Sequence, residues 1–228
     1  MAGRVTSNFV RALAVLAALG VAVAIGTGRI ARGTENERPQ ERETVAGFTT
    51  YAVPSAEFSI AVPESWQAFT AGEVFGEGRG LEQMARENPE YAPYLEALAD
   101  PRSPMKLIAV DPRVRGAFAT NVNVIAQDVA DDFSFEDFVR ESAPEVKSLA
   151  RNARGFKRDV VQLPAGSAQR LRFNGQFTQN GQVRSVATLQ YGVVANGWAY
   201  VLTYTTLPQF EAEYENDFER SARSFGFG

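Results

Sequence analysis

Residues 155–205 read GFKRDVVQLPAGSAQRLRFNGQFTQNGQVRSVATLQYGVVANGWAYVLTYT, and this stretch decides the fold. It contains two Asn-Gly pairs, Asn180-Gly181 and Asn196-Gly197, and both residues of such a pair tolerate the positive φ of a two-residue type I′ hairpin turn. Around these turns apolar side chains recur at every second position, the period of a strand with one face in a core. They are Leu171, Phe173, Phe177, Ala187, Leu189, Tyr191, Val193, Trp198, Tyr200, Leu202 and Tyr204. The stretch predicts four consecutive antiparallel strands.

A helix is predicted before these strands. Ser134 and Asp137 have the spacing of a capping box, in which each side chain binds the other residue's backbone N–H. We expect Pro144 to kink this helix and Gly155 to end it. The predicted buried stripe consists of Phe135, Phe138, Val139, Val146, Leu149 and Ala150.

A second helix is predicted from Leu207 to Phe225, after the four strands. Thr206 and Gln209 suggest another capping box, with Pro208 in the first turn, where proline is tolerated. Its apolar stripe consists of Phe210, Tyr214, Phe218, Ala222 and Phe225. A helix with one wide apolar stripe packs on a sheet face.

The first half of the chain predicts four further strands, with short helical segments between Gly80 and Ala99. These strands are Phe48–Val53, Glu57–Val62, Met105–Val110 and Thr120–Ala126. The order of predicted elements is therefore strands, short helices, strands, a helix, four strands and a helix.

The N-terminus has the layout of an export signal. Ala12 to Gly28 is a run of 17 residues without a charge, and Arg4 and Arg11 precede it. Ala22-Val23-Ala24 provides a small-x-small cleavage site. An uncleaved anchor is the alternative, although a helix of this length spans only about 26 Å of a hydrocarbon core of about 30 Å. A buried core helix is a third interpretation, disfavoured because the run has no polar face.

The orientation of such an anchor is open. Four arginines follow the apolar run, and positive charge favours the cytoplasmic side of a membrane. They are Arg29, Arg32, Arg38 and Arg42. Export of the bulk is the favoured prediction because the run is the first segment of the chain. We predict a signal or membrane anchor over residues 1–28, a disordered linker over 29–47 and one domain over 48–228.

Composition excludes several kinds of chemistry. The 228 residues include no cysteine and no histidine. This excludes disulfides, thiolate metal sites, cysteine nucleophiles and Ser-His-Asp triads. The net charge is −4, and residues 44–228 carry 17 basic against 23 acidic side chains. Such an acidic domain repels phosphate backbones, which argues against nucleic-acid binding.

Two groups of arginines are candidate binding residues. Arg113 and Arg115 lie in the predicted turn DPRVRGAF. They could form an anion site, or they could belong to a solvated loop without a ligand. Arg151 and Arg154, with Lys157 and Arg158 beyond them, lie where the first helix ends. Cations there complement the helix dipole, and an acidic partner or a lipid headgroup is the functional alternative.

Other motifs are weak. GEGRG at residues 76–80 follows no clear strand and lacks the Lys-Ser/Thr of a phosphate-binding loop. Asp111 and Asp131-Asp132 lack the alternating acids and glycine of a calcium loop. The aromatic side chains could line a ligand groove, but core packing is the favoured interpretation because three of them share one strand face. These are Trp66, Trp198, Tyr200 and Tyr204.

The string FSIAVPESW at residues 58–66 and the order of predicted elements resemble the PsbP/Mog1-like family, in particular its exported bacterial members. The motif is carried by Phe58, Ile60, Val62, Pro63 and Trp66. The resemblance covers residues 48–228. It implies an α+β fold in which helices flank an antiparallel sheet, an α/β/α sandwich, and a role in binding or assembly without catalysis. Lipoprotein members of that branch attach through a cysteine; this chain has none, so an anchor would use Ala12 to Gly28 itself.

The predicted function is therefore a non-catalytic, exported and membrane-associated binding module without cofactor or metal, whose partner is a protein or a small ligand. Two alternatives remain open. One is a carboxylate-based hydrolase acting on cell-envelope glycans, which requires at least two convergent acids with raised pKa in one pocket. The other is a membrane-anchored interaction domain that faces the cytoplasm.

Overall fold

A computed structural model describes residues 45–71, 95, 98, 100, 103–113, 115, 118–179 and 182–227. Several predictions lie outside these residues: the apolar run, most of the linker, the Asn180-Gly181 turn, GEGRG and, apart from Leu95 and Leu98, the helical segments between Gly80 and Ala99. Within the described ranges, no helix combines the length and the apolar character needed to cross a membrane.

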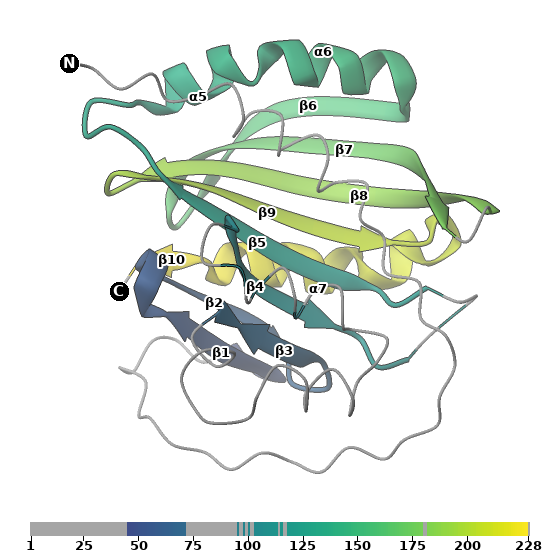
Figure 1. Ribbon diagram of the computed structural model, residues 1–228. Helices are drawn as coiled ribbons and strands as arrows, with labels where there is room; N and C mark the ends of the chain where they lie inside the picture. Colours follow the sequence, from purple (N-terminus) through teal and green to yellow (C-terminus); the bar gives the residue numbers. More distant parts are fainter. Residues whose placement is uncertain are drawn as a thin grey trace.

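The larger of two sheets has seven antiparallel strands in the order β3-β4-β5-β9-β8-β7-β6 (Figure 1). The strand bounds are β3 (Gln67–Thr70), β4 (Met105–Val110), β5 (Asn121–Asp128), β6 (Arg154–Leu163), β7 (Gly166–Gln179), β8 (Gln182–Ala195) and β9 (Trp198–Thr206). The four-strand prediction is confirmed as β6 to β9, and this meander forms one side of the sheet, with β6 at its edge.

The turn between β8 and β9 has the predicted geometry. Asn196 has φ 53° and Gly197 has φ 75°, so both residues adopt the positive φ that a type I′ turn requires. The β7–β8 register runs to the pair Gln179–Gln182. A turn of two residues fixes the register of each hairpin, and the register in turn fixes which side chains face the core.

The first strands form a separate small sheet, which the sequence analysis did not distinguish from the main one. Its order is β1 (Phe48–Val53), β2 (Phe58–Pro63), β10 (Gly226–Phe227). The short helix η1 (Pro54–Ala56) joins β1 to β2. Every residue of β2 is buried, because this strand packs with the C-terminal helix as well as against the main sheet.

The C-terminal helix begins later than predicted. A 3₁₀ turn, η3 (Pro208–Phe210), precedes α7 (Glu211–Ser224). The predicted capping box of Thr206 and Gln209 is wrong: Thr206 is the last residue of β9, and its hydroxyl is 2.8 Å from the hydroxyl of Thr120. The apolar stripe is confirmed, since Tyr214, Phe218, Ala222 and Phe225 are buried and Phe210 is partly buried.

The predicted first helix is two helices, α5 (Phe135–Glu141) and α6 (Ala143–Asn152). The capping box at Ser134 and Asp137 is confirmed, with both side chain to backbone hydrogen bonds present. Pro144 occupies the first turn of α6, so it starts a new helix where a kink was predicted. Gly155 does not end α6; it lies in β6 with φ 64°.

The helices cover both faces of the large sheet, which confirms the predicted α+β fold with flanking helices (Figure 1). One face packs against α7 and the small sheet through the aromatic side chains of β8 and β9. The other face packs against α5 and α6 through Phe138 and Val146. Gly192 permits the approach of α5, because a Cβ at this position would lie 2.4 Å from the Phe138 ring.

Candidate functional site

The loop after β4 holds Arg113 against a buried acid. Asp111 is fully buried, and it accepts hydrogen bonds from the Arg113 backbone N–H at 2.9 Å and from the guanidinium at 2.7 to 3.0 Å. The Tyr214 hydroxyl of α7 donates to the same carboxylate at 2.5 Å. Burial alone would raise the pKa of Asp111, but the hydrogen bonds from Arg113 and Tyr214 outweigh it and lower the pKa below the usual value.

Arg115 also has a carboxylate partner within the molecule. It forms an ion pair with Glu213 of α7 at 2.5 Å, and its guanidinium lies 4.8 Å from the centre of the Phe210 ring. Arg113 and Arg115 thus connect the β4–β5 loop to α7. The predicted anion site at these residues stays a prediction, and any ligand there would compete with Asp111 and Glu213.

The second arginine group lies at one edge of the main sheet. Arg151 lies in the last turn of α6 and Arg154 begins β6, so the short connection between these elements brings them together. Lys147 lies one helical turn before Arg151, while Lys157 and Arg158 continue along β6. We call these five exposed residues the cationic edge; no ion pair or hydrogen bond joins any of their side chains to another described residue.

The predicted aromatic cluster is core. Tyr200 donates to the Ala56 carbonyl at 3.0 Å, and Tyr204 donates to the Ser221 hydroxyl at 3.1 Å. Burial raises the pKa of both phenols. Trp66 packs edge-on against Tyr214 and Phe218 of α7. These contacts agree with the core interpretation and leave the aromatic rings no groove among the described residues.

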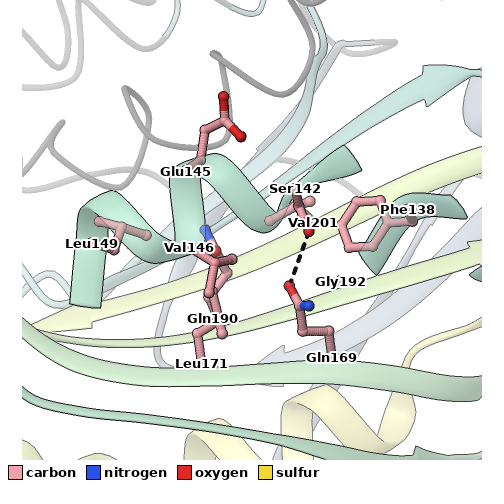
Figure 2. A pocket seen from close by; sticks show the side chains of 10 residues that line it. All are labelled: Phe138, Ser142, Glu145, Val146, Leu149, Gln169, Leu171, Gln190, Gly192 and Val201. Atoms are coloured by element: carbon pink, nitrogen blue, oxygen red, sulfur yellow. Dashed lines mark hydrogen bonds between the residues drawn. The ribbon is translucent and has the colours of Figure 1, made fainter. Parts of the chain in front are cut away.

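A small cavity lies between the sheet and the helices α5 and α6 (Figure 2). Its volume is about 10 Å³, room for about one water molecule. Gln169 is buried there, with its Oε1 3.5 Å from the Ser142 hydroxyl and its Nε2 without a partner among the described residues. Figure 2 shows the carboxylate of Glu145 directed away from Gln169 and Gln190. This cavity therefore lacks the two convergent acids that a glycan hydrolase needs.

A second cavity of the same size lies where α7 meets β7 and β8, and it does contain two acids. They are Glu211 and Glu215, and Arg172 lies 3.6 Å and 2.7 Å from their carboxylates. The ion pairs hold both acids against one cation. Where carboxyl pKa values of the described residues are shifted, at Asp111, Asp137 and Asp159, the shift is downward.

The described residues contain no cluster of three acids placed to hold a metal ion. Asp111 is occupied by Arg113 and Tyr214, and Asp131 and Asp132 lie in the turn before α5. Nothing in the described residues therefore supports a cation site at these three aspartates.

The sequence analysis missed a buried polar band on the α5–α6 face of the sheet. Neighbouring positions of β5, β9 and β8 carry amides and hydroxyls that are all buried. They are Asn121, Asn123, Thr203, Thr205, Thr188 and Gln190. The signal was present as the alternation NVNV at 121–124 and TYTT at 203–206. Gln190 donates to Thr203 at 3.1 Å within the band, and Asn121 donates to the Ala119 carbonyl at 3.0 Å outside it.

No family model matches the chain. Comparison with curated proteins also finds no match.

Solved structures do resemble it. PsbP (CyanoP) from Synechocystis is 13% identical, with a TM-score of 0.49 over 81% of this chain and 95% of that one. LpqN of Mycobacterium tuberculosis, which is involved in cell envelope biogenesis, is 14% identical, with a TM-score of 0.42 over 74% of this chain and 82% of that one. The Ran-binding protein Mog1p of Saccharomyces cerevisiae is 9% identical, with a TM-score of 0.44 over 79% of this chain and 95% of that one.

These similarities concern the arrangement of helices and strands, and at such low identity and TM-score no function of those proteins is carried over to this chain. PsbP and Mog1p, the two proteins after which the predicted fold is named, are both among the solved structures that resemble it.

Proposed function

We propose that this protein is a non-catalytic binding module that is exported and held at the outer side of the membrane by residues 1–28, and that it binds another protein. The observation that carries the proposal is the cationic edge. Its five cations are exposed and have no partner among the described residues, although the whole chain has a net charge of −4. Charged residues that are exposed and left unpaired in an otherwise acidic molecule favour association with a partner of opposite charge.

The proposal of a non-catalytic role rests on the side chains available. Histidine and cysteine are absent from the sequence, and they are the commonest general base and the strongest side-chain nucleophile near neutral pH. Both cavities have room for about one water molecule. The acids of the described part that have a shifted pKa are held in the charged form by arginines or hydrogen bonds, which suits structure better than proton transfer.

The proposed location rests on the N-terminal sequence. Ala12 to Gly28 has the composition of a signal or anchor, and the arginines before it form the basic segment that precedes such a run. We expect the full-length chain, with an epitope tag at its C-terminus, to sediment with membranes. We also expect added protease to degrade the tag in cells whose outer permeability barrier has been opened.

Two variants sharpen this experiment. L16R together with V21R places two charges in the apolar run, and each costs about 2.5 to 3.5 kcal/mol at the centre of a membrane span, so membrane association should be lost. L16I is the matched control and should behave as the native chain. A protein that is soluble in the cytoplasm would contradict the proposed location. A membrane-bound tag that protease cannot reach would instead support the cytoplasm-facing alternative.

A further inference from the structure

The outer edge of β6 is an open strand edge. Among the described strands, β6 is the last strand of the main sheet and pairs with β7 alone; Figure 1 shows it below α6. Four successive residues, Lys157 to Val160, are exposed, so neither face of the strand is covered along this segment. Alternate residues of an edge strand direct both N–H and C=O outward, where another strand can pair with them.

Cations lie on both faces of this edge. Lys157 is opposite Arg172, which forms ion pairs with α7, so the Lys157 side chain lies on the α7 face. Arg158 is opposite Leu171, which packs with Val146 of α6, so Arg158 lies on the α6 face. A strand added beside β6 would also direct its side chains to both faces, and each face offers it a positive charge.

The charge changes along the strand. Arg154, Lys157 and Arg158 make the first half of β6 positive, and Arg151 and Lys147 of α6 add to it. Asp159 does not cancel this charge, because it accepts from Arg170 of β7 at 2.6 Å. The second half, Val160 to Leu163, carries no charge, and Val160 is 60% exposed.

We propose that the β6 edge binds an extended acidic segment of a protein partner as an eighth strand of the main sheet. Every neighbouring pair in the sheet is antiparallel, and an antiparallel guest would place its acidic C-terminal half beside Arg154 to Arg158. Its N-terminal half, with β-branched apolar residues, would lie beside Val160 and Gln162. This inference rests on the proposed binding function and names the chemistry of the partner.

Two other occupants fit the geometry less well. An anionic membrane surface would approach from one side, whereas Lys157 and Arg158 lie on opposite faces, and a membrane offers no extended backbone to pair with β6. In an antiparallel pair, a second copy of the chain would place its uncharged half, Val160 to Leu163, beside Arg154 to Arg158, so it would bring no acid to neutralise these cations. Charged residues on an edge strand also hinder such self-pairing.

The test is a binding titration of the full-length chain in mild detergent. The probe is a fluorescent peptide of about ten residues, with alternating Thr and Val in its N-terminal half and Glu throughout its C-terminal half. We expect saturable binding that is lost when alternate peptide nitrogens are methylated, because methylation removes the N–H donors and keeps the charge. Equal binding of the methylated peptide would show a purely electrostatic contact and would overturn strand addition.

Charge-reversal variants locate the site. R154E together with R158E should weaken peptide binding about tenfold or more at low salt, since each exposed ion pair contributes modestly and two repulsions replace two attractions. K106E is the matched control, because Lys106 lies on β4, which four strands separate from β6 in the sheet, and it should change binding less than about twofold. Equal weakening by both variants would contradict a site at β6.

The remaining occupants are outcomes of the same test. Binding to phosphatidylcholine vesicles that contain phosphatidylglycerol, with no binding of the peptide, would assign the cationic edge to a membrane surface. A concentration-dependent dimer that V160P abolishes would assign it to a second copy. Either result overturns the acidic-segment inference. A cytoplasmic location together with normal peptide binding would overturn the proposed location and leave the inference standing.

Discussion

The arginines that face α7 and those of the cationic edge have opposite surroundings. On the α7 side each guanidinium meets carboxylates of its own chain, and these arginines are Arg113, Arg115, Arg170 and Arg172. At the β6 edge, Arg151, Arg154 and Arg158 meet none among the described residues. Residue type is the same in both groups, so the difference lies in position. Arginines paired across the sheet–helix interface join elements of the fold, and those left unpaired at an open edge are available to a partner.

Arg170 shows how the paired group works. Its guanidinium reaches Asp159 of β6 at 2.6 Å and Glu219 of α7 at 3.1 Å. The Arg170 side chain therefore connects the edge strand to the C-terminal helix. Because it pairs with Asp159, the only acid of β6, that acid is not available to the nearby cations. The paired group thus helps to leave the cationic edge unneutralised.

The largest expected effect comes from breaking the packing that brings α7 to its arginine partners. Phe218 is buried against Tyr204, Tyr214 and Trp66. We expect F218A to lower the free energy of unfolding by about 3 to 5 kcal/mol, because it leaves a cavity among aromatic rings. Chemical denaturation followed by far-ultraviolet circular dichroism measures this.

Val183 is the control for that measurement, because its side chain is 64% exposed. V183A should change the free energy of unfolding by less than about 0.5 kcal/mol. Equal effects of the two substitutions would contradict the placement of α7 on the aromatic face.

A smaller effect is expected when one charged pair of the α7 side is removed. In D111N the amide keeps the shape of Asp111 and loses its charge, so Arg113 and the Tyr214 hydroxyl lose a charged acceptor. We expect a loss of about 1 to 3 kcal/mol at neutral pH. R113A should cost less, because the Arg113 side chain is 55% exposed and water solvates it in part.

The pH dependence of D111N follows from the lowered pKa of Asp111 in the folded protein. A carboxyl with a lowered native pKa stabilises the fold above its unfolded pKa of about 3.9, and this contribution is lost as the pH falls through the native value. The stability difference between the native chain and D111N should therefore shrink below about pH 4. A difference that stays constant down to pH 2 would contradict the role of the Asp111 charge.

The smallest effect on stability is expected at the cationic edge. R154E together with R158E replaces two exposed cations of β6 that have no described partner, so the free energy of unfolding should change by less than about 0.5 kcal/mol per substitution. Thermal unfolding of the two-residue variant beside the native chain measures this. A loss comparable to that of D111N would show that these arginines hold the fold, and the distinction between the two groups would fail.

The sequence predicted the parts of the fold that depend on local pattern. Asn196-Gly197 determined a turn, Ser134 with Asp137 determined a helix start, and the spacing from Phe210 to Phe225 determined the buried face of α7. Each depends on residues within a single turn or a single helix. Thr206 was misassigned because its hydroxyl bonds to Thr120, a residue 86 positions away that no local pattern reveals.

The order of strands in the sheet was not predictable in this way. β5 lies between β4 and β9, so β9 is covered on both sides and β6 becomes the edge. The basic residues from Arg151 to Arg158 were visible in the sequence as a cluster at a helix end, and their position on an open edge depends on that long-range order. Glu213, the partner of Arg115, and Tyr214, which donates to Asp111, were hidden for the same reason, because both lie about a hundred positions further along the chain.

Hydrogen–deuterium exchange of the full-length chain, with and without the acidic peptide, tests the central claim most directly. Amides of β8 and β9 lie between paired strands and should exchange slowly in both states, whereas outward-directed amides of β6 should exchange fast in the free protein. We predict that the peptide slows exchange in β6, between Lys157 and Gln162, and leaves the β4–β5 loop with Arg113 unchanged. Protection at Arg113 with none in β6 would contradict the account.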